Sequence, residues 1–365
     1  MPSQNGTEAR TTKPARIGII GAGWWAAVNH IPSLMAIDGA ELVAICSPDA
    51  SAISKIQSEF GAIDAFDDHE DMLNSVDLDG VIVSSPHQFH YQHAVAALEA
   101  GCHVLVEKPF TTDVSEAKNL LLLGEEKDLT VSLSHGWNYM PIARDALELI
   151  RKGHIGEVQH VALQLASPTS DLFSGKGLIL AKDDLVQPQN STWADPSRAG
   201  GYGWGQLTHL LGLFFKLVDE DPADVFAFTS QSEAGVDYYN AVCMHLGNGA
   251  SGTVSGSSNM PSANPRFQVD IKVFGSKGNF LMDLESGRER VVVETMSGEE
   301  HALDLPAGAG DYDGASPVRH LVDTCHGIQD EDMAPAIVGL RSIAFLDAMY
   351  RSAASGSVEP VTALS

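Results

Sequence analysis

Short apolar runs alternate with amphipathic stretches through the first third of the chain. The runs are rich in Val and Ile and occupy residues 16–20, 41–46, 80–84, 103–107 and 130–134. Strands that are apolar along their whole length are buried on both faces, as in a parallel sheet. The clearest amphipathic stretch, 113–127, begins with the capping residue Asp113 and has Glu116 three residues later. The alternation predicts a doubly wound α/β domain of the Rossmann type over residues 14–136.

The pattern changes after a predicted helix at 140–152, because strand-like runs then follow one another. They lie at 158–166, 225–230, 241–246, 252–257, 268–274, 280–284 and 290–295. Strands that follow strands indicate a largely antiparallel sheet. Two helical stretches, 317–327 and 334–355, come next. We therefore expect residues 137–365 to form an α+β domain with a large, mostly antiparallel open sheet, whose final helices can pack back toward the first domain.

Two segments lack any periodicity. Residues 1–13 are polar and predict a disordered tail. Residues 167–205 carry much Gly, Pro, Ser and Asp. A loop of that length in a compact enzyme is usually functional or mobile, so this segment is interpreted as a lid or substrate loop.

Composition narrows the class of protein. The chain has 22 Lys and Arg against 48 Asp and Glu, a formal net charge of −26, which would repel nucleic acid. No apolar run approaches the roughly 20 residues of a membrane span, and the polar first residues lack an apolar leader, so we expect a cytoplasmic protein. The four cysteines are far apart and indicate reduced thiols rather than a metal site or disulfide framework: Cys46, Cys102, Cys243 and Cys325.

A glycine turn follows the first predicted strand. The form GxGxxA begins at Gly21 and Gly23, continues through Trp24 and Trp25, and opens a helix. The first glycine permits the tight turn, the second lets the backbone approach a pyrophosphate, and the small final residue allows close packing. A helix N-terminus then faces the phosphates. The context predicts a nicotinamide dinucleotide, NADP or NAD.

The end of the second strand bears on the choice between the two dinucleotides. Ser47 stands where an acid commonly meets the ribose of NAD, and its hydroxyl could donate to a 2′-phosphate. No Arg or Lys is beside it, and Asp49 could reach the ribose diol. The choice stays open, with a slight preference for NADP.

The segment GCHVLVEKPFTTDVSEAKNLLLLGEEKDL carries Glu107, Lys108 and Pro109 at the end of the fifth predicted strand. With SSPHQFHYQHAVAALEAG before it, and ALELIRKGHIGEV and GLRSIAFLDAMYRSAASG after it, it resembles the Gfo/Idh/MocA family of oxidoreductases over about residues 16–361. The resemblance implies an NAD(P)-dependent enzyme acting on a carbohydrate-like small molecule. It also implies a homodimer or homotetramer formed through the second sheet, with neither nucleic acid nor membrane as a partner.

Two catalytic residues are expected. Lys108 lies at the carboxyl end of a strand near the switch point, where a lysine can hydrogen-bond the reacting oxygen and stabilise developing negative charge. His209 matches the acid/base histidine of the family, which implies that it takes the substrate hydroxyl proton. The family's aspartate four residues earlier is replaced here by Gly205. Gln206, Thr208 or Asp195 is a candidate substitute for it.

Further candidates follow from position. Cofactor contacts are expected after the fourth strand at Ser84, Ser85, Pro86, His87 and His90, and after the fifth strand at Glu107, Lys108 and Pro109. Substrate contacts are expected after the sixth strand and on the long loop, at His135, Trp137, Asn138, Tyr139, Trp193, Asp195 and Arg198. His87 and His90 have no evident third ligand, so no metal is predicted.

The sequence thus predicts hydride transfer between nicotinamide and a secondary hydroxyl or keto group of a sugar, cyclitol or glycoside. One alternative is a redox-neutral glycoside hydrolase or lyase, since residues 207–212 vaguely resemble the histidine segment of such enzymes. Another is a non-catalytic nucleotide-binding regulator, against which Lys108 and His209 argue. Substrate identity, direction of reaction and number of subunits lie beyond the sequence.

Overall fold

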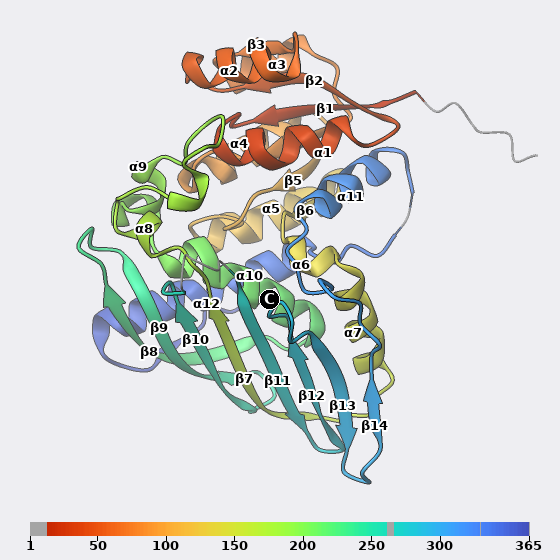
Figure 1. Cartoon of the computed structure of the whole chain (residues 1–365), viewed down its shortest axis with the longest axis vertical. Coiled ribbons are helices and arrows are strands. Elements are labelled where there is room, and N and C mark those ends of the chain that lie inside the picture. The colour runs from red at the N-terminus through yellow and green to blue at the C-terminus, as the bar shows by residue number, and fades with distance from the viewer. Residues whose placement is uncertain (1–12, 261–265, 329, 365) are drawn as a thin grey trace, which may run out of the picture.

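The structure is a computed structural model that describes residues 13–260, 266–328 and 330–364. The predicted tail, apart from Lys13, lies outside the described residues. Two sheets organise the chain, one of six strands and one of nine, stacked along the long axis of the molecule (Figure 1).

The first sheet is parallel throughout, with strand order β3-β2-β1-β4-β5-β6. Its strands are β1 (Ala15–Ile20), β2 (Ala40–Cys46), β3 (Asp64–Phe66), β4 (Gly80–Val83), β5 (His103–Val106) and β6 (Val131–Leu133). The order reverses between β1 and β4, which places a switch point at their carboxyl ends. The predicted doubly wound sheet is confirmed. The sequence missed β3, a three-residue edge strand that is largely exposed.

The helices of this part are α1 (Ile31–Met35), α2 (Ala50–Phe60), α3 (His69–Ser75), α4 (His90–Glu99) and α5 (Val114–Lys127). A π-helical turn, Ala26–His30, leads into α1. Aspartates cap three of these helices, because the carboxylates of Asp49, Asp68 and Asp113 accept backbone N–H bonds from the first turn. The cap that the sequence predicts at Asp113 is therefore present.

The second sheet has the order β14-β13-β12-β11-β7-β10-β9-β8-β15, and its pairs are antiparallel except β7 with β10. Its strands are β7 (Val158–Ala166), β8 (Pro222–Gln231), β9 (Asp237–Leu246), β10 (Ser251–Ser257), β11 (Gln268–Gly275), β12 (Gly278–Asp283), β13 (Arg290–Thr295), β14 (Glu300–Ala302) and β15 (Glu359–Pro360). The predicted open antiparallel sheet is confirmed. The two short edge strands, β14 and β15, were missed.

Helices cover one face of the second sheet and join it to the first (Figure 1). They are α6 (Gly136–Tyr139), α7 (Pro141–Arg151), α10 (Thr208–Leu217), α11 (Ala315–Cys325) and α12 (Ala336–Ser355). Helix α11 packs against β1, β4 and β5, where Val318 and Leu321 join the core of the first sheet. Helix α12 contacts α5, α10 and β8. The final helices therefore pack against both sheets.

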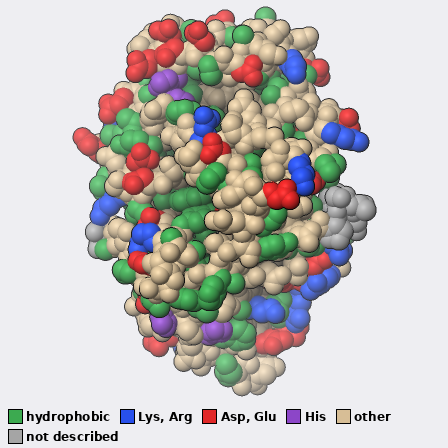
Figure 2. Space-filling model, turned by 90° about the vertical axis from the view of Figure 1, so that its left-hand side faces the viewer, with side chains coloured by type: hydrophobic (Ala, Val, Ile, Leu, Met, Phe, Trp, Pro, Cys, Tyr) green, Lys and Arg blue, Asp and Glu red, His purple; other side chains and the backbone are tan. Residues whose placement is uncertain are grey.

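Within the described residues, no element covers the opposite face of the second sheet. Side chains along β9 alternate between buried and exposed, and Tyr239, Cys243 and His245 are among the exposed ones. Such alternation is typical of a sheet with one side on a core. On the face that Figure 2 shows, hydrophobic side chains gather across the middle, and acidic side chains are frequent at the end formed by the first sheet.

Residues 167–205 contain short helical turns joined by irregular stretches: α8 (Ser170–Phe173), α9 (Asn190–Trp193) and two 3₁₀ turns, Ile179–Ala181 and Pro196–Arg198. The segment reaches the first domain, where the indole Nε1 of Trp24 donates to Asp184 Oδ2 at 2.7 Å. We call it the covering segment.

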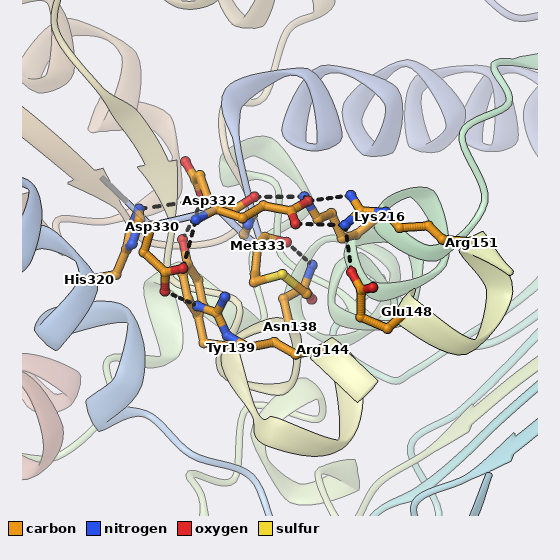
Figure 3. A network of polar contacts seen from close by, with 12 residues as sticks. Asn138, Tyr139, Arg144, Glu148, Arg151, Lys216, His320, Asp330, Asp332 and Met333 are labelled. Atoms are coloured by element: carbon orange, nitrogen blue, oxygen red, sulfur yellow. Dashed lines mark hydrogen bonds and ion pairs between the residues drawn. The ribbon is translucent and has the colours of Figure 1, made fainter. Parts of the chain in front are cut away.

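A polar network ties the connection between α11 and α12 to four other elements (Figure 3). The Glu331 carboxylate accepts two hydrogen bonds from the Arg151 guanidinium, at 2.9 and 2.6 Å, and one from Lys216 Nζ at 2.7 Å. Asp332 accepts from Ser132 of β6 at 2.6 Å and from Tyr139 at 2.8 Å. The network fixes the positions of β6, α6, α7 and α10 relative to one another. Helices α6 and α10 carry candidate site residues.

Within the described residues, no helix is long and apolar enough to cross a membrane. That same part of the chain holds no group of three or more His, Cys, Asp or Glu side chains suited to a metal ion. All four cysteines are free thiols.

Candidate active site

The glycine turn between β1 and the following helix lies against the end of β4. Gly21 has φ +93°, and a Cβ there would come within 2.2 Å of the backbone nitrogen of Ser85, so only glycine fits. At Gly23 an added Cβ would have no neighbour closer than 3.9 Å. The second glycine therefore faces open space, as required for backbone N–H groups to approach a pyrophosphate.

A cavity of about 440 Å³ extends from this turn. Its walls include the expected cofactor residues Gly21, Gly23, Trp24, Trp25, Ser47, Ser84, Ser85 and Pro86. The covering segment supplies the opposite wall, with Val186, Gln187, Pro188, Gln189, Thr192, Trp193 and Arg198. A glycine cradle, a free helix N-terminus and an elongated cavity together fit a dinucleotide. The sequence predicted Trp193 and Arg198 of this segment as substrate contacts, but it gave no signal for the other five wall residues, because the segment lacks periodicity.

Acidic side chains lie at the far end of the cavity, after β2 and β3. Asp49 and Asp67 line the wall beside Ser47. Asp49 is fixed as the cap of α2, since its carboxylate accepts from the backbone N–H groups of Ser51 at 3.0 Å and Ala52 at 3.1 Å. Asp67 was not recognised from the sequence.

Lys108 follows β5, and its peptide bond to Pro109 is cis. Its Nζ donates a hydrogen bond to the carbonyl oxygen of Gly205 at 3.0 Å and lies 4.8 Å from the ring centre of Trp193. Burial lowers the pKa of Lys108 below its usual 10.5, although the Glu107 carboxylate opposes that shift. The ammonium group is therefore a half-buried cation between the two halves of the chain.

The carboxylate of Glu107 interacts with the charge of Lys108. Burial would raise its pKa, but the hydrogen bond and charge of His30, with the Lys108 charge, lower the pKa of Glu107 to about 2. Its Oε1 lies 3.1 Å from His30 Nε2, and both side chains are buried. The carboxylate is thus ionised and partly neutralises the Lys108 cation.

His209 is buried in the first turn of α10. Its ring packs against the rings of His135, Trp137 and Tyr312, with centroids 5.6, 5.5 and 5.4 Å away. Burial, followed by the charges of Lys108 and His135, lowers its pKa well below 6.5. The imidazole is therefore neutral near pH 7 and competent to accept a proton.

The turn that precedes α10 is positioned by a buried aspartate that the sequence did not single out. Asp237 of β9 accepts from the backbone N–H of Gly203 at 2.9 Å and from the Tyr350 hydroxyl at 2.8 Å. Burial raises the pKa of Asp237, and its hydrogen bonds offset part of that shift. This anchor places the π-helical turn Gly203–Leu207, and with it the Gly205 carbonyl that faces Lys108.

The space beside Gly205 is already filled. A Cβ at this position would lie 2.8 Å from Phe173 Cζ and 3.2 Å from Trp193 Cζ3. A carboxylate has no room there in this arrangement. Of the three candidate substitutes, Asp195 accepts from Ser197 at 2.6 Å and pairs with Arg198 at 3.6 Å. Gln206 and Thr208 are buried.

The walls of the cavity do not include five of the expected cofactor residues, His87, His90, Glu107, Lys108 and Pro109, and their contact with a cofactor stays a prediction. The two ring nitrogens of His90 each lie 2.7 Å from a backbone oxygen, one of Ser85 and one of Pro109. His90 therefore links the segment after β4 to the segment after β5. His87 Nδ1 lies 2.9 Å from the Ala199 oxygen, and the ring contacts Trp193. Burial, then the charges of His90 and Lys108, lowers the pKa of His87 to about 3.

Three of the expected substrate contacts, Asn138, Tyr139 and Trp137, have hydrogen-bond partners within the protein. The Asn138 amide donates to the backbone oxygens of Gly212 at 3.0 Å and Met333 at 2.9 Å, and Tyr139 bonds Asp332 (Figure 3). The Trp137 indole donates to the Gly310 oxygen at 3.1 Å, although its ring also forms one wall around His209.

A parallel sheet with a glycine turn at its switch point and a lysine facing the second domain defines a dinucleotide-binding protein of the oxidoreductase class. Two family models match the chain: "Oxidoreductase family, NAD-binding Rossmann fold" over residues 15–135, and "GFO/IDH/MocA C-terminal domain" over residues 143–281. The chain belongs to the Gfo/Idh/MocA oxidoreductase family.

Relatives with assigned activities match part of the chain. It is 32% identical to D-glucoside 3-dehydrogenase of Escherichia coli over 150 residues, which are 41% of this chain and 43% of that protein. It is 27% identical to D-xylose 1-dehydrogenase (NADP⁺) of Hypocrea jecorina, over 73% of this chain and 70% of that enzyme. The match to the first of these proteins thus spans less than half of its length.

Solved structures share the fold across nearly the whole chain. The apo scyllo-inositol dehydrogenase from Lactobacillus casei has a TM-score of 0.76 at 20% identity, covering 97% of this chain and 100% of that one. GenD2 from gentamicin A biosynthesis, in complex with NAD, has a TM-score of 0.76 at 21% identity, covering 97% and 98%. At such identities the likeness shows the fold alone.

Proposed function

We propose that this protein is a nicotinamide-dependent dehydrogenase or reductase that acts on a secondary hydroxyl or keto group of a sugar, cyclitol or glycoside. The observation that carries the proposal is the placement of Lys108 and His209. Half-buried Lys108 lies 4.8 Å from the ring centre of Trp193, which lines the cavity, and it binds the carbonyl of Gly205, four residues before the buried, neutral His209. The names of relatives, a glucoside dehydrogenase and a xylose dehydrogenase, support the substrate class.

The bound dinucleotide would supply the hydride acceptor or donor, and Gly21, Gly23 and the first turn of the following helix would hold its phosphates. In alcohol oxidation, Lys108 exchanges the Gly205 carbonyl for the substrate oxygen and donates a hydrogen bond to it. That bond strengthens as negative charge develops on the oxygen. His209 takes the hydroxyl proton on the ring nitrogen opposite the buried Nδ1, so that the substrate O–H bond breaks as an N–H bond forms. Carbonyl reduction uses the same residues in reverse.

Trp193 and Phe173 are proposed as the walls that replace the family's aspartate. Their rings lie 6.4 Å apart at 70°, and the edges of both fill the space beside Gly205. An aromatic wall stacks on the apolar face of a sugar ring, whereas a carboxylate binds a hydroxyl. We therefore infer that this enzyme contacts its substrate by packing at a position where an aspartate side chain would offer a hydrogen bond.

The lining of the cavity supports NAD rather than NADP. A 2′-phosphate beside Ser47 would lie near the carboxylates of Asp49 and Asp67, and like charges in proximity are unfavourable. Among the described residues that line the cavity, Arg198 is the sole Lys or Arg, and it pairs with Asp195 at 3.6 Å. The sequence suggested a slight preference for NADP, and the acidic surroundings of Ser47 argue for the opposite choice.

We also propose a homodimer or homotetramer formed through the uncovered face of the second sheet. Large apolar side chains are exposed on it, since Phe228 is 67%, Tyr239 39% and Phe274 38% accessible. Apolar surface gathered on one face of a sheet marks an association site.

One experiment tests the central proposal. Reduction of NAD and of NADP is followed at 340 nm against a panel of sugars, cyclitols and glycosides, with Lys108→Ala as the comparison. The expected result is turnover of at least one panel member by the wild type and a loss of at least about 100-fold in Lys108→Ala. An unchanged rate in Lys108→Ala on a responsive substrate would refute the assigned role. Firm dinucleotide binding without turnover of any panel member would favour the non-catalytic regulator.

A further inference from the structure

A second buried imidazole, that of His135, lies beside His209. His135 follows β6 and is almost fully buried, and neither of its ring nitrogens has a hydrogen-bond partner within the described part of the chain. The ring rests on Gly212 of α10, where an added Cβ would come within 2.7 Å of His135 Cδ2 and 2.8 Å of His135 Nε2. Helix α10 thus has no side chain at the position that His135 occupies, three residues after His209.

Unpaired polar atoms gather where the β6–α6 segment meets α10. The Nδ1 of His209 is also buried without a partner among the described residues, as are Thr208 Oγ1 and Asn138 Oδ1. The two imidazole centroids are 5.6 Å apart with the rings at 71°. Buried polar atoms are seldom left unpaired in proteins, and such places commonly hold water or exchange protons. A purely structural ring at position 135 would not need nitrogens.

The proton released in alcohol oxidation needs a route away from His209. The imidazole is 6% exposed and enclosed by Trp137, Tyr312 and His135. Bound substrate and nicotinamide would occupy the remaining open side. A route toward solvent on that side is therefore blocked until the product leaves, whereas the route toward His135 is inside the protein.

We propose that His209 and His135 form a two-imidazole proton relay, in which His209 accepts the substrate proton and His135 receives it next. The proposal rests on the proposed function. The substrate O–H bond breaks as an N–H bond forms on one nitrogen of His209, giving an imidazolium. The Nδ1–H bond of His209 then breaks as a bridging water molecule accepts that proton, and the water gives up another proton to form an N–H bond on His135. Each step moves one proton and one positive charge, and reduction runs the steps backward.

Charges around the pair favour this direction. The groups that face it are Glu107 and Lys108 from the end of β5, and the Tyr312 hydroxyl. Burial lowers the pKa of His135 to about 4, the Glu107 carboxylate acts to raise it, and Lys108 acts to lower it. For His209, burial and the Lys108 and His135 charges all lower the pKa. The Glu107 carboxylate therefore stabilises a cation on His135.

The test compares His135→Gln with the wild type and with His320→Gln, which changes a buried histidine outside the catalytic site. The first readout needs no substrate: long-range ¹H–¹⁵N spectra of histidine-labelled protein at pH 7 report which His209 nitrogen carries the proton. The relay predicts that His135→Gln changes the ¹⁵N shift of His209 Nδ1, whereas His320→Gln leaves it unchanged. Identical His209 shifts in all three proteins would overturn the proposal.

The second readout is kinetic. With a substrate that the wild type oxidises, His135→Gln should lower kcat at least tenfold, leave KM and NAD binding within twofold, and increase the solvent deuterium isotope effect. An unchanged kcat and isotope effect would overturn the relay while leaving the dehydrogenase assignment intact. Absence of turnover in the wild type would instead defeat the proposed function, and the ¹⁵N shifts would still decide whether the two imidazoles are coupled. His135→Phe, which keeps the ring volume, separates a packing defect from loss of the nitrogens.

Discussion

The ammonium group of Lys108 donates its hydrogen bond to the backbone carbonyl of Gly205, at 3.0 Å. The contact joins residues 97 positions apart and links the end of β5 with the turn before α10. It holds the lysine where a substrate oxygen would take the place of the carbonyl. It also shows why a glycine at position 205 matters: the backbone binds Lys108, while the space for a side chain belongs to Phe173 and Trp193.

The first prediction concerns Gly205→Asp. The new side chain would collide with Phe173, so we expect a loss of about 1–3 kcal/mol in the free energy of unfolding, as for other overpacked cores. Urea denaturation measures this loss. Gly247→Asp, at an exposed glycine where a Cβ would meet only an ordinary 3.5 Å contact, is the matched control and should change stability little. Equal stabilities of the two variants would contradict the steric argument.

The second prediction concerns pH. Oxidation needs neutral His209 and protonated Lys108, and burial lowers the pKa of both groups. The acid limb of kcat/KM should therefore lie below pH 6.5, and the alkaline limb should lie below pH 10.5. His209→Asn should remove the acid limb and lower kcat by about 10²–10⁴-fold. An acid limb at or above pH 6.5 that persists in His209→Asn would assign the base to another group.

The third prediction concerns the dinucleotide. Because Asp49 and Asp67 lie beside Ser47, the wild type should bind NAD at least tenfold more tightly than NADP, as measured by titration calorimetry. A double change, Ser47→Arg with Asp67→Asn, should reverse that order by supplying a cation for the 2′-phosphate. Asp145→Asn alters the charge by one unit on the exposed side of α7 and serves as control. Tighter NADP binding by the wild type would restore the preference that the sequence suggested.

The fourth prediction concerns the network at Glu331. Its hydrogen bond from Arg151, opposed by burial and aided by Lys216, lowers the pKa of Glu331 to about 2. A depressed carboxyl pKa adds stability above the unfolded value of 4.5, and this stability is lost as pH falls toward 2. Glu331→Gln should therefore lower the free energy of unfolding at pH 7 by about 1 kcal/mol or less, since the site is partly exposed.

Thermal unfolding at pH 7 and at pH 2.5 checks this prediction. The difference between Glu331→Gln and the wild type should shrink at the lower pH. Glu148→Gln removes the more exposed partner of Arg151 and should have a smaller effect at pH 7. A difference that is the same at both pH values would show that the charge of Glu331 is not what stabilises the fold.

The fifth prediction concerns assembly. Phe228→Glu places a charge on the uncovered sheet face and should shift the protein toward monomers in light scattering coupled to size-exclusion chromatography. Met35→Glu, on α1 of the first sheet, charges a residue that is similarly exposed and should leave the mass unchanged. A monomeric wild type, or equal masses for both variants, would rule out association through this face.

Much of the fold was predictable because its signals are local. The continuously apolar runs of β1, β4 and β5 report burial on both faces, and Asp113 caps the helix that it was expected to cap. The strands that were missed, β3, β14 and β15, have only two or three residues. They are mostly exposed and carry no apolar run, whereas the equally short β6, which the sequence predicted, is buried along its length.

The candidate site likewise has a part that the sequence predicted and a part that it did not. Gly21, Gly23 and the Glu107–Pro109 motif stand in short patterns whose chemistry is set by their place after a strand, so the sequence alone determined the dinucleotide turn and the position of Lys108. Only the tertiary structure decided that Gly205 faces Lys108, that the covering segment forms the second wall of the cavity, and that Asn138 and Tyr139 are engaged with the backbone and with Asp332. The physical reason is range: periodicity and turn chemistry act over a few residues, whereas contacts between distant segments depend on how both sheets and their helices pack.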